Sequence, residues 1–252
     1  MKRTLAASLL ALSATLAAAP AMAQDVSVSV SVDYVTEYVF RGVTLAEDAI
    51  QPGVEVGIGD FYVGGWFSAA FGDTSIFSGD EFDLYAGYGI ALSDTLALDV
   101  GATYYHYPQG PGGFFESDGG GVDGTYEVYG GLSFDTVLAP SVYAYYDLDL
   151  SNLTLEGSIG HSIPLADATS LDLGLTAGLV AADGDGDYEY GQASAALTYG
   201  FTDDVSVYAS ANFALASEDN FVDGDFDFAN ETLDIDVDDN TFFLAFGISA
   251  GF

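Results

Sequence analysis

The acidic residues within the strand-like segments of this chain fall at positions that alternate with apolar residues. Because side chains alternate between the two faces of a strand, these acids share one face of each segment. Ten acids have this position: Asp33, Glu37, Glu55, Glu81, Asp83, Asp99, Glu127, Asp147, Glu156 and Asp172. Six tyrosines accompany them: Tyr85, Tyr105, Tyr129, Tyr143, Tyr145 and Tyr208. Carboxylates gathered inside a tube of strands would attract cations and repel anions.

Two interpretations fit this acidic face. A water-filled lumen lined by carboxylates would be a channel with cation preference, because charged rings are how pores select ions. A filled barrel would instead use the same acids as hydrogen-bond partners for the tyrosines and for water. We expect the conducting lumen, with these acids and Arg41 as its lining.

Arg41 is the only basic residue beyond the first three positions of the chain. It follows an acid, Glu37, by four residues, so the two side chains lie on the same face of an extended strand. A structural ion pair between them is the expected role, because a guanidinium matches a carboxylate with two parallel hydrogen bonds. Binding of a ligand by Arg41 is the alternative.

The two histidines give no support for catalysis. His106 and His161 fall in the outward phase of their segments, whereas Ser158 and Ser162, the serines near His161, fall on the opposite face. A hydrolase needs its nucleophile, base and orienting group within hydrogen-bond reach of one another. We therefore expect no enzyme, no catalytic residue and no cofactor, and we expect both histidines to pack at the membrane interface.

One acidic loop invites a calcium interpretation. Asp183, Asp185 and Asp187 alternate with glycines, as in the start of an EF-hand loop. That motif needs Gly at its sixth position and a carboxylate at its twelfth, where this chain has Tyr188 and Ser194. No metal site is assigned, and weak divalent-cation binding by clustered loop acids stays open.

Strand-like segments occupy most of the chain. Charge on a lipid-facing surface costs a few kcal/mol near the membrane midplane, so the apolar face of each segment must point outward and the acidic face inward. We predict an all-β transmembrane antiparallel up-and-down barrel of about twelve strands, each near the length that a tilted membrane strand needs. The apolar alternation runs over residues 26–40, 54–58, 61–69, 82–90, 96–104, 126–134, 142–148, 153–163, 171–179, 193–199, 205–215 and 242–252.

The connections between these segments differ in length. Short turns, such as Gly59-Asp60 and Ser93-Asp94, alternate with longer loops that include residues 41–50, 108–124 and 217–240. Short periplasmic turns and long outer loops are typical of barrels with both termini in the periplasm, so we expect 217–240 outside the cell. Aromatic residues in the outward phase are expected to form the interface girdle: Tyr34, Tyr38, Phe40, Trp66 or its neighbour Phe67, Tyr88 and Tyr104.

The last strand carries an assembly signal. Apolar side chains occupy alternate positions from Phe242 to Phe252, where the sequence ends. A soluble protein rarely leaves such a strand exposed, because an apolar edge invites aggregation. The aromatic end resembles the carboxy-terminal signal that the outer-membrane barrel assembly machinery reads, with Phe252 as the signal residue.

The amino terminus has the pattern of a secretory signal. Lys2 and Arg3 precede an apolar, alanine-rich stretch, which ends in Ala21-Met22-Ala23. Such small residues favour cleavage after Ala23. We expect two parts: residues 1–23 as a signal peptide and residues 24–252 as one barrel. Cysteine is absent, so disulfide and thiolate chemistry are excluded.

The charge balance is extreme. The chain has 39 acidic residues against three basic ones, while half of its residues are hydrophobic. Phosphate backbones would be repelled, which excludes nucleic acid as a partner. A halophilic soluble protein would also be acidic, but its strands would not be apolar along one whole face. An apolar outer band combined with an acidic interior and acidic loops accounts for both properties.

Several sequence blocks resemble one known family. The most specific block is Glu37-Tyr38-Val39-Phe40-Arg41-Gly42, followed by Gln51-Pro52, and softer blocks follow in order at 61–66, 81–88, 104–108 and 126–132. They resemble the TorF-type porin family of Gram-negative outer membranes over the first half of the chain, and the second half agrees in general pattern. The resemblance implies an outer-membrane porin with no known substrate. The extended acidic loop before the last strand departs from the family pattern. The properties of the family at the pore mouth are therefore the least transferable to this chain.

Together, these patterns predict a cell outer-membrane channel for passive diffusion of small solutes, with cation preference. Its expected partners are outer-membrane lipids, the assembly machinery and the solutes or cations themselves. The alternative is a non-conducting barrel whose acidic extracellular loops bind a partner or divalent cations.

Overall fold

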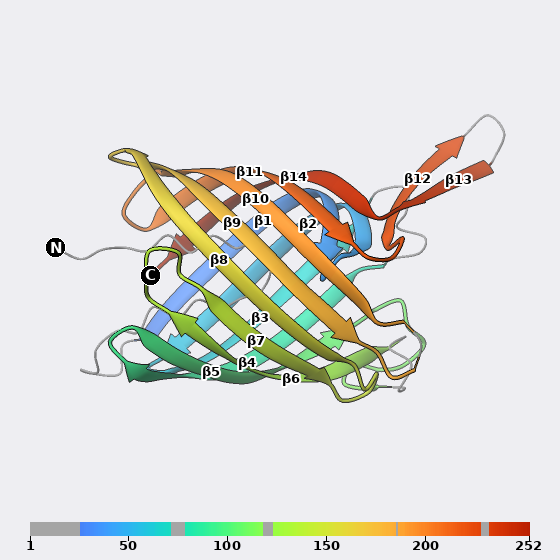
Figure 1. Ribbon diagram of the computed structural model, residues 1–252, viewed down its shortest axis with the longest axis horizontal. Coiled ribbons are helices and arrows are strands. Elements are labelled where there is room, and N and C mark those ends of the chain that lie inside the picture. The colour runs from blue at the N-terminus through green and yellow to red at the C-terminus, as the bar shows by residue number, and fades with distance from the viewer. Residues whose placement is uncertain (1–25, 72–78, 118–122, 185, 228–231) are drawn as a thin grey trace.

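The computed structural model describes residues 26–71, 79–117, 123–184, 186–227 and 232–252. Twelve antiparallel strands in this part of the chain form a closed barrel, and each strand pairs with its sequence neighbours around the ring. The predicted fold class is confirmed (Figure 1). The barrel strands are β1 (Val26–Phe40), β2 (Val43–Ile58), β3 (Phe61–Ala70), β4 (Glu81–Ser93), β5 (Leu96–His106), β6 (Gly124–Phe134), β7 (Ser141–Asp147), β8 (Leu153–Ala166), β9 (Thr169–Ala181), β10 (Tyr188–Gly200), β11 (Val205–Ala216) and β14 (Asn240–Gly251).

The first and last strands close the ring. β1 and β14 pair in register from Ser29 opposite Gly251 to Val35 opposite Ala245. The backbone of Phe252 continues the pairing, because its N–H donates to the Val28 carbonyl and its own carbonyl accepts from the Val28 N–H. The chain end is thus part of the wall, and the ring has no unpaired edge at this seam.

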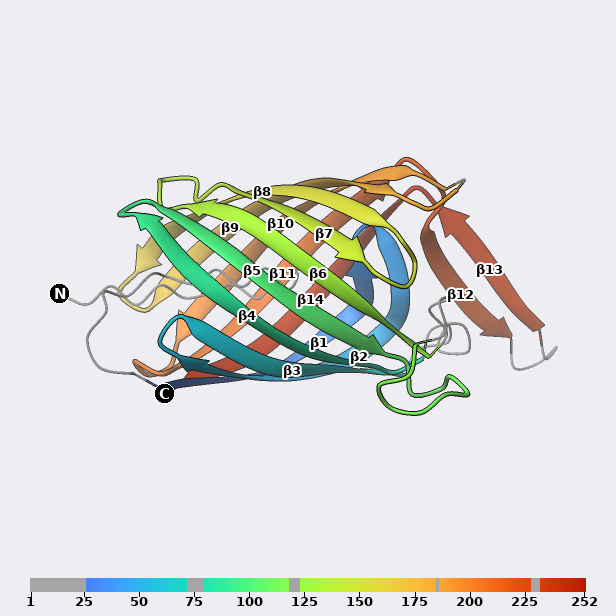
Figure 2. The same cartoon turned by 90° about the horizontal axis from the view of Figure 1, so that it is seen from below.

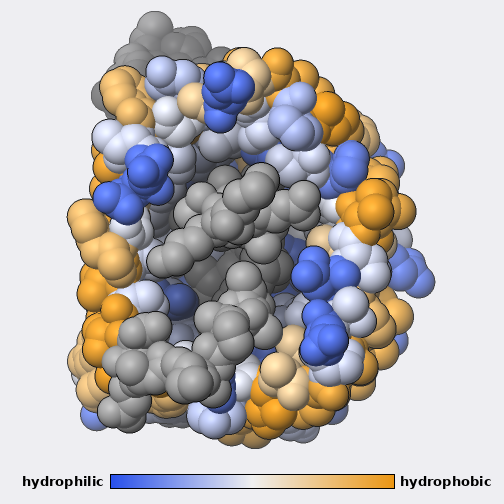
Figure 3. Space-filling model, turned by 90° about the vertical axis from the view of Figure 1, so that its left-hand side faces the viewer, coloured by the Kyte–Doolittle hydropathy of each residue, from blue (hydrophilic) through white to orange (hydrophobic). Residues whose placement is uncertain are grey.

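The two faces of the wall differ in polarity. Large apolar side chains remain exposed on the outward face, among them Val100, Val142 and Leu175, which expose 40%, 50% and 54% of their surface. Hydrophobic residues gather around the outside of the ring in the end-on view of Figure 3. Buried acids such as Asp99 and Glu127 lie on the inward face. This division follows from the two-residue period of the sequence.

The two ends of the barrel carry different connections. At one end, here called the turn end, lie the start of β1, the end of β14 and short connections such as residues 59–60 and 94–95. At the other end, the loop end, lie the longer connections, including residues 107–123 and 217–239. A hairpin of β12 (Phe221–Asp227) and β13 (Thr232–Asp238) projects from the loop end as a separate two-stranded sheet (Figures 1 and 2).

The connection between β1 and β2 is shorter than the sequence indicated. A loop over residues 41–50 was expected, and this prediction is wrong, because β2 begins at Val43 and pairs with Phe40. Arg41 and Gly42 both have positive φ, 50° and 76°. Positive φ at both central residues is the geometry of the two-residue hairpin turn that matches strand twist. Arg-Gly provides this turn in place of the usual Asn-Gly, and the strands continue to its edge.

The tip of this hairpin leaves the wall. Pairing of β1 with β14 stops at Val35, and pairing of β2 with β3 stops at Ala49, which faces Ala70. Beyond these points β1 and β2 pair only with each other, with a register shift at Tyr38/Val39. We call residues 36–48 the inward hairpin. In Figure 2 the blue ribbon of β1 and β2 curves away from the neighbouring strands at the loop end.

Among the described residues, no helix has the length and apolar character needed to cross a membrane. Residues 1–25, which hold the predicted signal peptide and Ala23, lie outside the described part of the chain.

Candidate channel lumen

The inward hairpin contacts inward-facing residues of strands on several sides of the ring. Tyr38 packs against Trp66 of β3, with ring centroids 5.3 Å apart, and Phe40 packs against Tyr105 of β5 at 6.0 Å. The side chain of Arg41 reaches further round the ring, to β6 and β7. Within a closed barrel, contacts with the inner faces of so many strands place the hairpin tip inside the lumen.

Arg41 ends in a cage of aromatic rings and a carboxylate. Its Nη1 and Nη2 donate to the two carboxylate oxygens of Glu127 at 2.6 and 2.9 Å. Its guanidinium carbon lies 4.6 Å from the ring centre of Phe40 and 4.1 Å from that of Tyr145. The hydroxyl of Tyr105 donates to the same carboxylate at 3.0 Å. We call Phe40, Tyr105, Glu127 and Tyr145 the arginine cage.

The expected pairing of Arg41 with Glu37 is wrong. The bidentate partner is Glu127, which is 86 residues away in sequence. Glu37 accepts hydrogen bonds from the hydroxyls of Thr44 and Thr241. Arg41 lies at the tip of the extended hairpin, so its side chain crosses the lumen towards β6. It does not turn back along β1 towards Glu37. The Arg41 and Glu127 side chains expose 13% and 4% of their surface, so the pair is largely shielded from water.

The opposite side of the hairpin packs on an apolar cluster. Val39 contacts a group of inward residues from β9, β10, β11, β12 and β14: Val180, Tyr190, Ala214, Ala216, Phe221 and Phe243. Gly42 approaches this group so closely that an added Cβ would overlap Tyr190. Position 42 therefore requires glycine for its positive φ and for its packing. The cluster also joins the base of the β12–β13 hairpin, through Phe221, to the inward hairpin.

On the wall, five of the predicted lining acids lie towards the loop end: Glu81, Asp83, Glu127, Asp147 and Glu156. The carboxylate of Glu156 accepts a hydrogen bond of 2.6 Å from Tyr190. Asp147 instead accepts from the backbone N–H groups of Asp149 and Leu150, so it stabilises the β7–β8 connection. Just beyond β5, burial and the nearby carboxylates of Glu81 and Asp83 raise the pKa of Tyr107. That phenol stays protonated and can act as a hydrogen-bond donor.

Asp33, Glu55, Asp99 and Asp172 lie nearer the turn end, and hydroxyl groups of the wall hold each of them. Tyr62 donates to both oxygens of Asp99, at 3.0 and 3.2 Å, and Tyr143 donates to one of them at 3.3 Å. Tyr85 bonds to Glu55, and Thr198 donates to Asp172 at 2.7 Å. Buried carboxylates need such donors, because leaving them without partners costs free energy.

Several of these tyrosines lie over inward-facing glycines of neighbouring strands. An added Cβ on Gly87 would overlap the hydroxyl end of Tyr62, because the ring lies against the wall where a side chain is missing. The same arrangement joins these pairs: Gly64 with Tyr85, Gly101 with Tyr129, Gly131 with Tyr143, and Gly178 with Tyr190. Rings that cover glycine backbone lie along the wall and take less of the lumen's cross-section than rings that project into it.

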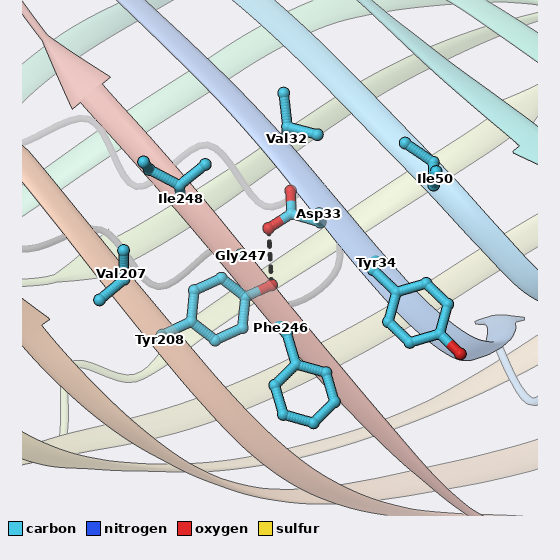
Figure 4. Close-up of a pocket in the computed structure, with 9 residues that line it drawn as sticks. All are labelled: Val32, Asp33, Tyr34, Ile50, Val207, Tyr208, Phe246, Gly247 and Ile248. Atoms are coloured by element: carbon cyan, nitrogen blue, oxygen red, sulfur yellow. Dashed lines mark hydrogen bonds between the residues drawn. The ribbon is translucent and has the colours of Figure 1, made fainter.

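The seam of the barrel holds one further acid–tyrosine pair. Tyr208 of β11 donates to Asp33 of β1 at 2.8 Å and crosses Gly247 of β14 (Figure 4). A shallow, open hollow of about 440 Å³ lies at this place, and its lining is mainly apolar: Val32, Asp33, Tyr34, Ile50, Val207, Tyr208, Phe246, Gly247 and Ile248. A Cβ at position 247 would overlap Asp33, so the glycine permits a hydrogen bond that joins three strands at the closure.

The predicted aromatic girdle is partly wrong. Tyr38, Phe40 and Trp66 face inward, because they pack on one another or on Tyr105, and Phe67 is the outward neighbour that packs on Phe82. The register shift of β1 and the inward course of the hairpin reverse the expected direction of Tyr38 and Phe40. Tyr34 stacks with outward Phe246, as the girdle prediction requires.

The histidines do not form a catalytic arrangement with a serine. His106 is buried under the aromatic residues of the β5–β6 connection, 4.7 Å from the ring centre of Phe114, and its Nδ1 lies 3.0 Å from the Asp123 carbonyl. His161 is exposed, and its Nδ1 lies 2.9 Å from the Val137 carbonyl. Within the described residues, no group of three His, Cys, Asp or Glu side chains is placed to bind a metal ion.

A closed antiparallel ring with an apolar outer face and acids on its inner face has the architecture of transmembrane β-barrels. The chain belongs to a family of bacterial proteins of unknown function, Gcw_chp, whose sequence model matches residues 17–171. No curated protein sequence matches the chain.

Two solved porin structures have a similar fold. The KdgM porin superposes with a TM-score of 0.55 at 9% identity, over 90% of this chain and 99% of that one. The NanC porin superposes with a TM-score of 0.52 at 13% identity, over 88% of this chain and 98% of that one. Identities this low show that the fold is shared.

Proposed function

We propose that this protein is an outer-membrane channel for passive diffusion of small solutes, with a preference for cations. The observation that carries the proposal is the charge of the inner face. All ten predicted lining acids lie on barrel strands, and the one cation among the lining candidates, Arg41, is paired with Glu127. A passing anion meets no unpaired basic group of this set, whereas a passing cation meets carboxylates inside low-dielectric walls.

The proposed location follows from the same architecture. The fold shared with KdgM and NanC porins, the apolar outer face and the resemblance to TorF-type porins support a Gram-negative outer membrane. Residues 1–23 would act as the cleaved signal peptide and 24–252 as the barrel. On this topology the loop end faces the outside of the cell. The proposal is of a channel rather than an enzyme.

Assembly through the last strand is part of this proposal. Phe252 exposes 74% of its surface while its backbone pairs with Val28, so the side chain is free for recognition by the assembly machinery. Replacing Phe252 with Ser should lower the amount of folded barrel in the outer membrane. Equal amounts of heat-modifiable, membrane-inserted protein in both strains would contradict this role.

The solutes should differ from the ligand named for KdgM. One KdgM structure is described in complex with disordered oligogalacturonate, which is a polyanion. The acidic lumen of this chain should repel such a molecule, because like charges in a confined low-dielectric space interact strongly. The shared fold therefore supports a channel, but it does not indicate that the two proteins pass the same class of solute.

A second candidate function is a non-conducting barrel whose acidic loops bind a partner or divalent cations. The inward hairpin favours it, because this element occupies the mouth and carries the base of the projecting β12–β13 hairpin through Val39 and Phe221. Asp236, Asp238 and Asp239 are exposed at the end of β13, where they could meet a partner.

Single-channel recording distinguishes the two functions. The refolded protein without residues 1–23 is added to a planar bilayer in potassium chloride, after a heat-modifiability gel has shown that it is folded. Stepwise conductance supports the channel. A folded barrel that inserts but stays silent would favour the binding function.

A further inference from the structure

A carboxylate lies between two aromatic residues on the inner wall near the loop end. Trp66 of β3 pairs across the strands with Asp83 of β4, and Asp83 pairs in turn with Tyr105 of β5. Directly paired residues of neighbouring strands point to the same face, so the three side chains form one row. We call Trp66, Asp83 and Tyr105 the acidic–aromatic row.

The central acid of this row has an oxygen without a partner. Asp83 exposes 3% of its surface, and its Oδ1 is buried without a hydrogen bond. Glu81, two residues earlier on the same face of β4, is equally buried and is hydrogen-bonded both to Tyr38 and to Asp83, so only Oδ1 of Asp83 remains without a partner. An unpaired buried carboxylate oxygen is costly, so its presence on the inner wall indicates a place for a positively charged group.

The neighbouring arginine cage shows which group fits such surroundings. There the guanidinium of Arg41 contacts two aromatic rings and one carboxylate, and Tyr105 belongs to both sites. The two sites and the adjacent Glu81 contain three carboxyl groups: Glu127 is paired with Arg41, whereas Glu81 and Asp83 are hydrogen-bonded to each other, which requires a proton on one of them. The Glu81–Asp83 pair therefore keeps one negative charge without a cationic partner among the described residues.

We propose that the acidic–aromatic row is a binding subsite for the guanidinium group of a small organic cation. A guanidinium is planar, weakly hydrated and able to stack on aromatic rings while it donates to a carboxylate. Its ring contacts would come from Trp66 and Tyr105, and its hydrogen bond would go to Asp83 Oδ1. Tyr38 of the inward hairpin packs on the Trp66 ring of the row, so the ligand gains access when the Tyr38 ring moves aside. The subsite deepens the proposed function, because it names a class of solute.

Trp66 provides a direct readout, because it is the only tryptophan of the chain. Methylguanidinium chloride is titrated into the refolded barrel in detergent at constant ionic strength, while tryptophan emission is recorded. A saturable change in emission is expected. N-methylurea, which has a similar shape and no charge, should cause no saturable change, and potassium should compete only weakly.

Matched variants locate the binding. Asp83→Asn removes the charge with little change in shape and should weaken methylguanidinium binding at least roughly tenfold, the loss expected for a hydrogen bond between charged groups. Asp172→Asn is the control, because this lining acid is held by Thr198 and Ser170 and lies at the turn end. Heat modifiability shows that each variant is folded. If Asp83→Asn does not fold, Glu81→Gln replaces it and should weaken binding by a smaller factor.

Four results would overturn the subsite: no saturable change in emission, an equal response to N-methylurea, saturation by potassium at the same concentration, or equal weakening by Asp172→Asn. Conductance separates the subsite from the channel. A barrel that binds methylguanidinium and stays silent in the bilayer would refute the channel and keep the subsite. A conducting, cation-preferring barrel without the emission change would keep the channel and refute the subsite.

Discussion

The two ends of the lumen use the same residue types for different purposes. Near the turn end, acids such as Asp99 accept hydrogen bonds from hydroxyls of the surrounding wall, such as that of Tyr62. Near the loop end, the acid Glu127 and the phenol of Tyr105 hold an element that has left the wall, through Arg41. In the first case the acid–tyrosine pairs line the barrel, and in the second they anchor a hairpin inside it.

This difference indicates where charge acts on a permeating ion. Turn-end acids have neutral partners, so their negative charge remains available to attract cations. At the loop end Arg41 neutralises one carboxylate and brings aromatic rings into the lumen with it. We therefore expect the turn end to contribute general cation attraction, and the loop end to contribute narrowing and selection among cations.

The largest expected effect comes from the ion pair at the loop end. Glu127→Gln leaves Arg41 buried without its counter-charge and should lower the free energy of unfolding by roughly 3 kcal/mol, as for other buried pairs that lose one partner. Urea denaturation, monitored by tryptophan emission, measures this loss of stability. Glu55→Gln, at the turn end, is the matched control with a smaller expected change.

A double variant sharpens that prediction. Arg41→Met combined with Glu127→Leu replaces both charges with apolar side chains and should recover much of the lost stability, because no buried charge remains unpaired. If Glu127→Gln and Glu55→Gln unfold at the same urea concentration, the ion pair does not anchor the hairpin.

The turn of the inward hairpin should give the next largest effect. Gly42→Ala must adopt positive φ and also overlap Tyr190, which should cost roughly 2–3 kcal/mol. Gly59→Ala is a matched control, because Gly59 has a φ of 63° with nothing near an added Cβ, and should cost about 1 kcal/mol. The same denaturation experiment compares them. Equal costs would mean that the hairpin tip does not pack as described.

The order of these effects could not be read from sequence alone. Alternation of apolar and polar residues is a local property, and it predicted the twelve-stranded ring and the inward face of the acids. The partner of Arg41 depends on the position of Glu127, 86 residues away, and no local pattern encodes that distance. The one local signal for the inward hairpin was Arg41-Gly42, which can form a two-residue turn, although it lacks the usual asparagine.

The inward orientation of Tyr38 and Phe40 near this turn was not predicted, for a related reason. A strand's two-residue period assigns Tyr38 and Phe40 to the outer face, and this assumption fails where β1 shifts register and leaves the wall. By contrast, residues of the regular wall, such as Asp33 and Asp99, lie on the face that their phase predicted. The two-residue period therefore predicts the direction of a side chain correctly where its strand pairs with both neighbours, and it fails where the strand pairs with only one.

The smallest effect is expected at the turn end. Tyr62→Phe removes hydrogen bonds to Asp99, while Tyr143 still donates to this acid, so the loss should be about 1 kcal/mol. Tyr88→Phe, on the exposed outer face, should change stability by less than about 0.5 kcal/mol. A loss at Tyr62 larger than that at Glu127 would reverse the proposed roles of the two ends.

The central claim is that acids of the lumen select cations, and the reversal potential under a potassium chloride gradient tests it most directly. The refolded barrel is measured in a planar bilayer near 0.1 M and near 1 M salt, because the Debye length falls from about 10 Å to about 3 Å between these concentrations. We predict a reversal potential whose sign corresponds to potassium selectivity and which persists at high salt, because lumen acids between low-dielectric walls are weakly screened. A reversal potential of the sign for chloride selectivity, or one that vanishes at 1 M salt, would contradict it.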